Sequence, residues 1–141
     1  REGKPQLTTF PSKAKGMVTK TGIKIYSWCE HHIVPIKMTI HFSYLPQDKV
    51  VGISKIIRLI EWCCSRLVIQ EELNEDIVEI FEKEIQPKGV MCVIEGEHFC
   101  EEIRGVKTKN RTITSALRGA YNNLDTRTEF LRLIGGNGNK I

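Results

Sequence analysis

The chain has 141 residues, of which 40% are hydrophobic and 27% are charged, and it carries a net charge of +4. This length and composition suit one compact domain, and without a run of about 20 apolar residues the chain is not expected to cross a membrane. The charges are scattered, so nucleic acid is not an expected partner, and the lack of a secretory signal pattern favours the cytoplasm.

The first half of the chain predicts an arm, two strands and a helix. Residues 1–16 have little periodicity and are expected to form an N-terminal arm that depends on a neighbouring element for order. Residues 23–28 and 34–45 are rich in β-branched and aromatic residues, as half-buried strands are. After Gly52 the apolar residues recur every three or four positions as far as Leu67, which predicts a long amphipathic helix.

The next part predicts a second helix and a hairpin. Asn74 is placed to cap a helix that Pro87 would stop. Residues 90–94 form a short β-branched run, and residues 99–106 are expected to return as its antiparallel partner. The chain therefore repeats the pair of strands after the pair of helices.

The last part predicts a helical end. Residues 115–134 indicate one or two short helices broken near Asn122, and the glycine-rich residues 135–141 indicate a flexible tail. The order of strands and helices is ββααββ, which predicts an α+β fold. One domain, residues 17–134, is expected between the arm and the tail.

Cysteine and histidine residues gather in two short segments. Cys29 and His32 stand three residues apart at the predicted turn after the first strand, where they could close on one metal ion, and residues 97–100 bring a second imidazole and thiol together. If Cys29, His32 and Cys100 bind zinc, a fourth position stays open for water, which is typical of catalytic zinc and favours hydrolysis. The alternative is a reduced cysteine beside surface histidines. The five cysteines, two of them adjacent, do not suit a disulfide framework.

Two further histidines lie beside this predicted metal group. His31 and His98 are candidates for proton transfer, because imidazole titrates near neutral pH. The alternative for each is a structural histidine whose hydrogen bonds are satisfied by the protein. That alternative is the interpretation for His41 on the second predicted strand.

Other polar residues could bind a nucleotide. Ser54 and Lys55 open the long predicted helix with Arg58 one turn later, which suits a phosphate, and Arg104 is a further cation. The alternative is an N-capping serine followed by solvated cations. At the far end of the same predicted helix, the Gln70-Glu71 pair offers a carboxylate for the edge of a guanine ring, with a solvated helix end as the alternative.

Taken together, these segments resemble the GTP cyclohydrolase I family from about Met17 to Ile134. The motifs that carry the resemblance are Cys-Glu-His-His at 29–32 before Pro35, Tyr-Leu-Pro at 44–46, Gly-x-Ser-Lys at 52–55, Ser65-Arg66 with Gln70-Glu71, Glu97-His98-x-Cys100, Arg-Gly-Val at 104–106, and Thr114-Ser115 with Gly119. Each motif is common alone, but the ordered set is specific.

The resemblance implies a fold, an activity and an assembly. The fold is the tunnelling fold, an antiparallel sheet with helices on one face that closes into an oligomeric barrel, here a homodecamer with active sites between subunits. The activity is the zinc-dependent conversion of GTP to 7,8-dihydroneopterin triphosphate and formate, which opens pterin and folate or deazaguanine synthesis. The implied roles are zinc ligation by Cys29, His32 and Cys100, proton transfer by His31, His98 and Ser54, triphosphate binding by Lys55, Arg58 and Arg104, and guanine binding by Gln70 and Glu71.

Two other functions stay open for this sequence, and it differs from the family's usual motifs at some positions. The alternatives are another tunnelling-fold enzyme acting on pterins or deazaguanines, and a structural zinc module with four protein ligands. The family's upstream Thr-Pro-x-Arg motif is not found in these residues, so either the sequence is a trimmed or naturally short form, or Lys4, Lys13 and Lys15 of the arm substitute. Glu72 also stands where the family commonly has an arginine.

Overall fold

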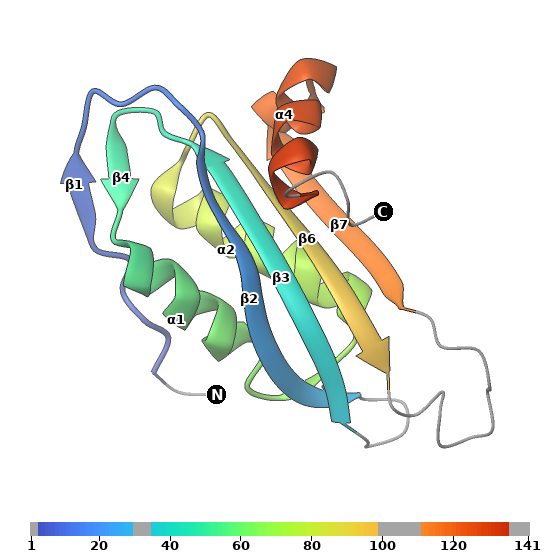
Figure 1. Ribbon diagram of the computed structural model, residues 1–141. Coiled ribbons are helices and arrows are strands. Elements are labelled where there is room, and N and C mark those ends of the chain that lie inside the picture. Colours follow the sequence, from blue (N-terminus) through green and yellow to red (C-terminus); the bar gives the residue numbers. More distant parts are fainter. Residues whose placement is uncertain (1–2, 30–34, 99–110, 136–141) are drawn as a thin grey trace.

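The structure is a computed structural model that describes residues 3–29, 35–98 and 111–135. Its elements in chain order are β1 (Thr9–Pro11), β2 (Val18–Cys29), β3 (Pro35–Leu45), β4 (Lys49–Val51), α1 (Ile53–Cys63), β5 (Leu67–Val68), α2 (Gln70–Ile85), β6 (Gly89–His98), β7 (Thr112–Gly119), the 3₁₀ turn η1 (Ala120–Asn122) and α4 (Leu124–Ile134). Five strands form one sheet in the order β5-β2-β3-β6-β7, and β1 pairs with β4 in a small second sheet (Figure 1).

The main sheet is antiparallel except at one edge. β3 pairs with β2 on one side and with β6 on the other, and β7 follows β6, all in antiparallel register. Only the two-residue β5 runs parallel to its neighbour β2. A bulge in β2 beside Gly22, at φ +71°, shifts the register against β3 between Lys20 and Ile23.

The core forms between one face of this sheet and the helices α1 and α2, which lie behind the strands in Figure 1. Alternate residues of β3 point into it, as the period of two in a strand requires. The largest fully buried side chains of this core are Phe42, Tyr44 and Phe81, whose rings contact one another, with Ile36, Met38, Ile40, Ile56, Leu59, Ile60 and Ile77.

The opposite face of the sheet is covered in part by α4. Met91 and Val93 of β6 pack there against Tyr121 and Phe130, and this contact forms a second, smaller core. Asn123 caps α4 with its side-chain oxygen, which accepts from the amides of Asp125 and Thr126. The rest of this face, at the lower end in Figure 1, carries no helix among the described residues.

The structure confirms the ββααββ order and corrects several boundaries. The first helix ends at Cys63 instead of continuing to Leu67, which lies in β5. The second helix begins at Gln70, so Asn74 lies inside it and is no cap. Residues 115–119 belong to strand β7 and are not helical.

The partner of β6 is also different from the one expected. β7 pairs with it over residues 112–119, whereas the predicted partner, residues 99–106, lies outside the described residues. The break near Asn122 is confirmed by η1, and the arm is held by the pairing of β1 with β4. The expected tail lies outside the described residues except for Gly135.

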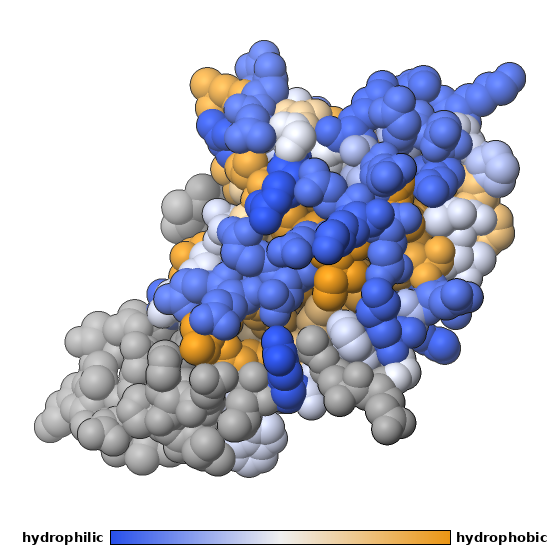
Figure 2. Space-filling view, turned by 180° about the vertical axis from the view of Figure 1, so that it is seen from behind, coloured by the Kyte–Doolittle hydropathy of each residue, from blue (hydrophilic) through white to orange (hydrophobic). Residues whose placement is uncertain are grey.

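The outer surface of the helices is polar. Figure 2 shows the helix-covered face, where hydrophilic residues predominate and hydrophobic ones show in a band near the middle. No helix among the described residues is long and apolar enough to cross a membrane.

Candidate functional site

Two strands that carry predicted site residues end at the same end of the sheet. β2 and β6 are both antiparallel to β3, which lies between them, so they run parallel to each other. Ser27 and His98 both pair with Ile36 of β3, in one row across the sheet. β2 ends at Cys29 and β6 ends at His98, although about 70 residues separate them in the sequence.

Four residues predicted for the site lie outside the described residues. These are His31 and His32, which follow β2, and Cys100 and Arg104, which follow β6. The structure therefore brings together the strand ends from which both predicted segments depart. The ligand set itself stays a prediction.

The start of α2 lies beside the end of β2. Cys29 pairs with Val68 in the parallel contact between β2 and β5, and α2 begins two residues later at Gln70. The Gln70-Glu71 pair therefore opens the second helix. This places it next to the strand end that carries Cys29. The sequence pattern predicts this pair at the end of the first helix, and that prediction is wrong.

The two residues of that pair have different surroundings. Gln70 is 2% exposed, and its Nε2 lies within hydrogen-bonding distance of acceptors on β6 and β7. Glu71 is exposed to solvent. Among the two, only Glu71 presents its side chain at the surface.

A buried serine holds β2 against the turn that precedes α2. The hydroxyl group of Ser27 is a donor with two acceptors in reach. Its Oγ atom lies 2.8 Å from the carbonyl oxygen of Cys64 and 3.1 Å from that of Arg66. Ser27 is 7% exposed and lies two residues before Cys29. The sequence reasoning missed it, although a polar residue on the inward face that Ile23 and Ile25 define is a recognisable signal.

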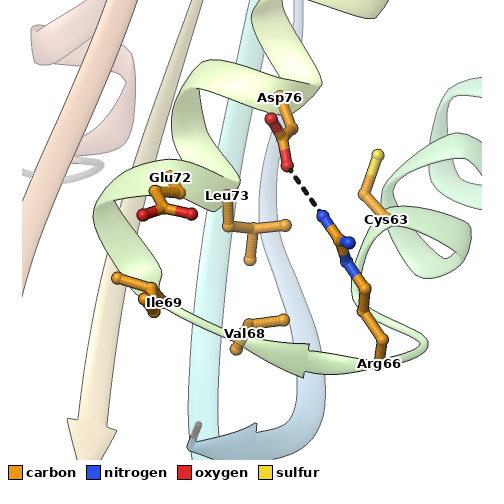
Figure 3. A pocket seen from close by; sticks show the side chains of 7 residues that line it. All are labelled: Cys63, Arg66, Val68, Ile69, Glu72, Leu73 and Asp76. Atoms are coloured by element: carbon orange, nitrogen blue, oxygen red, sulfur yellow. Dashed lines mark hydrogen bonds and ion pairs between the residues drawn. The ribbon is translucent and has the colours of Figure 1, made fainter. Parts of the chain in front are cut away.

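A small pocket of about 70 Å³ lies beside the start of α2. Figure 3 shows Arg66 reaching from the turn after α1 toward Asp76 of α2, with 3.3 Å between its guanidinium nitrogen and the carboxylate oxygen. Glu72 lies at the other side of the pocket in this view, beyond Leu73. Both side chains of the ion pair are largely exposed, so the pair adds little to stability.

The predicted phosphate-binding residues lie at the other end of α1. Gly52 precedes the helix without a side-chain cap, so the predicted serine cap is not formed, and Ser54 is exposed in the first turn. Lys55 and Arg58 line an open cleft of about 540 Å³ between α1 and the arm. Since α1 has 11 residues, about 15 Å of helix separates its start from the end near β5.

Three further cysteines are buried in the structure. Cys63, Cys64 and Cys92 are buried cysteines of the main core. Burial, with Cys64 and Cys63 nearby, raises the pKa of the Cys92 thiol well above its usual value. The Cys92 thiol is therefore protonated at neutral pH in the absence of a metal ion.

A polar cluster on the open face of the sheet was not predicted as a unit. His41 is 6% exposed, its Nε2 lies 2.7 Å from Glu95, and its Nδ1 accepts the amide of Gly22 at the bulge. Arg111 reaches the other oxygen of Glu95 at 3.3 Å. The interpretation of His41 as a structural histidine is confirmed.

Among the described residues, no three side chains of histidine, cysteine, aspartate or glutamate form a group that could hold a metal. The predicted donor set of two cysteines and one histidine fits zinc chemically. The fold is compatible with it, because the two segments that supply the donors follow β2 and β6, which lie on either side of β3 and end at the same end of the sheet.

The chain matches known proteins over most of its length. A family model described as GTP cyclohydrolase I matches residues 2–135. GTP cyclohydrolase 1 of Campylobacter curvus (strain 525.92) is 47% identical over 127 residues, covering 89% of this chain and 67% of the relative. GTP cyclohydrolase 1 of Aquifex aeolicus (strain VF5) is 45% identical over 122 residues, covering 85% and 66%. The chain thus spans about two thirds of the length of these relatives.

Two solved structures share the fold at low sequence identity. The apo archaeosine synthase QueF-Like has a TM-score of 0.64 and 17% identity, and the match covers 77% of this chain and 98% of that one. A putative dihydroneopterin aldolase (FolB) from Vibrio cholerae O1 has a TM-score of 0.57 and 7% identity, covering 75% and 98%. These confirm the α+β tunnelling fold, and the sequence matches establish that the chain belongs to the GTP cyclohydrolase I family of enzymes.

Proposed function

We propose that this chain converts GTP to 7,8-dihydroneopterin triphosphate and formate in the cytoplasm, as the first step of pterin and folate or deazaguanine synthesis. Zinc is the proposed cofactor, held by Cys29, His32 and Cys100. The observation that carries the proposal is the match to the GTP cyclohydrolase I family over residues 2–135. The convergence of β2, β6 and the start of α2 at one end of the sheet supports it.

The roles of the proposed proton-transfer and substrate groups follow from their chemistry. Zinc at this site would supply a Lewis acid that lets water act as a nucleophile at neutral pH. His31 donates a proton to the guanine imidazole nitrogen as that ring opens, because imidazolium is an effective acid near pH 7. His98 and Ser54 move protons at the ribose, and Glu71 accepts hydrogen bonds from the guanine edge.

The proposed phosphate contacts include two residues of α1 that lie before its C-terminal end. Lys55, Arg58 and Arg104 would hold the triphosphate through charge-assisted hydrogen bonds. Within one chain, however, α1 rises about 12 Å from Lys55, and about 7.5 Å from Arg58, to its end at Cys63, after which β5 follows. We therefore propose that Ser54, Lys55 and Arg58 serve the site of a neighbouring subunit in a homodecamer.

Exposed apolar side chains at both edges of the sheet support such an assembly. Tyr26 and Trp28 of β2 are 64% and 51% exposed, and Ile113 of β7 is 57% exposed. β5 covers only the last two residues of β2, and the outer edge of β7 has no partner strand among the described residues. Neighbouring copies that pair at these edges would bury both features.

The decisive experiment incubates the purified protein with GTP and zinc and follows pterin absorbance together with released formate. We expect both products in equal amounts. Removal of zinc with a chelator should abolish them, and added zinc should restore them. Folded, zinc-loaded protein that forms neither product would refute the proposed activity.

Two substitutions separate metal binding from proton transfer. His31→Ala should retain zinc and lose ring opening, with at least about a hundredfold fall in kcat, since general acid catalysis contributes on that order. Cys100→Ala should lose zinc as well as activity, measured by metal analysis. Cys64→Ala removes a buried thiol of the main core and is the matched control, which should keep its zinc. Equal zinc in all three variants would show that the ligand set is wrong.

A further inference from the structure

The side chain of Gln70 is fully engaged with the sheet. Its Nε2 lies 3.1 Å from the carbonyl oxygen of Ile94, 2.9 Å from that of Thr112 and 3.1 Å from Oγ1 of Thr114. An amide nitrogen has two hydrogens, and three acceptors already compete for them. At 2% exposure, this nitrogen reaches a substrate only if a buried hydrogen bond is broken.

These contacts connect α2 to both strands near the candidate site. Ile94 lies in β6, four residues before His98 at its end, and Thr112 is the first residue of β7. One side chain at the start of α2 therefore fixes the position of the helix against the middle of β6 and the start of β7. Loss of the Gln70 amide would remove a donor from the carbonyl groups of Ile94 and Thr112, which would lower the free energy of unfolding.

A second amide strengthens the same connection. Asn74 lies one turn further along α2, is fully buried, and donates through Nδ2 to the Oγ1 atom of Thr114. Residues four apart lie on the same face of a helix, so Gln70 and Asn74 converge on one hydroxyl group. The contact between α2 and β7 is therefore a polar network and not an isolated hydrogen bond.

Glu71, in contrast to the buried Gln70, is exposed to solvent. It follows Gln70 directly, and adjacent helical residues point in directions about 100° apart. Gln70 accordingly faces the sheet while Glu71 is exposed. Any movement of Gln70 shifts the backbone from which Glu71 projects.

We propose that Gln70 is a positioning residue that holds Glu71 in place relative to β6 and the start of β7, and that it does not contact the substrate. This inference rests on the proposed function, and it replaces the guanine contact that the family resemblance implies for Gln70. Glu71 is then the one side chain of the pair that reads the base.

A double-mutant cycle on kcat/KM tests this role. Gln70→Met keeps the length of the side chain but removes the donors, and Thr114→Val removes one acceptor at a residue that is not among the proposed substrate contacts. We expect kcat/KM for GTP to fall about tenfold and about threefold, respectively, as the loss of one or two modest hydrogen bonds would give. The double variant should fall about tenfold rather than about thirtyfold, because both changes break one network.

Several outcomes would overturn the inference. Wild-type kcat/KM in Thr114→Val, or multiplicative effects in the double variant, would mean that Gln70 acts on the substrate directly. A lowered unfolding temperature with unchanged kcat/KM in both variants would reduce its role to stability. If Gln70→Met does not fold, Thr114→Val alone decides. Ser115→Ala, which removes an exposed hydroxyl from the same strand, should keep wild-type kcat/KM.

A separate measurement distinguishes failure of the inference from failure of the proposed function. Amide hydrogen exchange of the zinc-loaded protein needs no substrate, and Gln70→Met should raise exchange in the first turn of α2 and at the start of β7. If the wild-type protein does not convert GTP, the proposed function fails. Unchanged exchange would contradict the positioning role in either case.

Discussion

At the scale of single residues, buried polar side chains act as connections between elements. Ser27 connects β2 to the turn before α2, and His41 connects the β2 bulge to β6. Tyr121 connects η1 to β3 through a 2.6 Å hydrogen bond between its hydroxyl group and Ser43 Oγ. None of these connections follows from periodicity, because a period predicts which face a residue occupies but not its partner.

The buried phenol of Tyr121 predicts a loss of stability at high pH. Burial raises the pKa of Tyr121 to about 12, and the hydrogen bond to Ser43 opposes part of that rise. The folded-state pKa lies above the unfolded value of about 10. The contribution of the neutral Tyr121 phenol to the free energy of unfolding is therefore complete below pH 10 and is lost as the pH rises toward 12. Burial also raises the pKa of Tyr44, so the total decline includes both groups.

Urea unfolding at fixed protein concentration between pH 9 and about pH 11.5 measures this effect. Tyr121→Phe should be less stable than the wild type at pH 9, because the bond to Ser43 is lost, and its stability should decline less steeply with pH. Tyr26→Phe removes a phenol that is 64% exposed and controls for the substitution. Parallel profiles for the wild type and Tyr121→Phe would contradict the prediction.

At the scale of elements, the sequence predicts the main sheet better than its edges. The alternation in residues 34–45 predicts β3 correctly, since its inward positions are all large and apolar. β7 is not recognised because Thr114, Ala116 and Arg118 face α2 in place of large apolar residues. Their partners on α2 include polar Gln70, so this strand lacks the usual hydrophobic pattern.

Other boundaries fail for related reasons. The apolar period of α1 continues by chance through Leu67, and only the pairing of β5 with β2 ends the helix earlier. The candidate site could be predicted as motifs, because its residues are local in sequence. Its assembly depends on the parallel direction of β2 and β6, which is a property of the whole sheet.

The turn between β7 and η1 predicts a large effect of one methyl group. Gly119 has φ +65°, and a Cβ atom there would lie 2.4 Å from the carbonyl oxygen of Lys88. Gly119→Ala should destabilise the protein by about 3 kcal/mol, because both the backbone angle and the close approach are lost. Gly16→Ala, where a Cβ atom would meet nothing within 4 Å, should change stability by less than about 0.5 kcal/mol. Similar effects of both substitutions on urea unfolding would refute this account.

At the scale of the whole molecule, the proposed site and the proposed assembly depend on each other. The start of α1 lies at the far end of that helix from β5, and we propose that neighbouring copies complete the site. The sheet edges at β2 and β7 are the surfaces proposed to meet. The described residues of one chain therefore account for only part of the proposed chemistry.

Charge placed on a sheet edge should break the assembly. Ile113→Lys introduces a cation at an exposed apolar position of β7, where a neighbouring copy would have to bury it. We expect light scattering to report a smaller oligomer and the GTP-converting activity to fall in parallel. Lys83→Glu changes an exposed charge on α2 and should leave the oligomer intact. An unchanged mass for Ile113→Lys would place the interface elsewhere.

The order of strands in the sheet also has a consequence for synthesis of the protein. β2 and β3 are neighbours in the chain, whereas β6 joins β3 only after both helices have been made, with pairs such as Ile36 and His98. Contacts so distant in sequence form late, because a long loop must close first. At roughly 5–20 residues per second, translation separates Cys29 from His98 by about 4–14 s. During that interval the first half of the proposed metal site exists on the ribosome without the second.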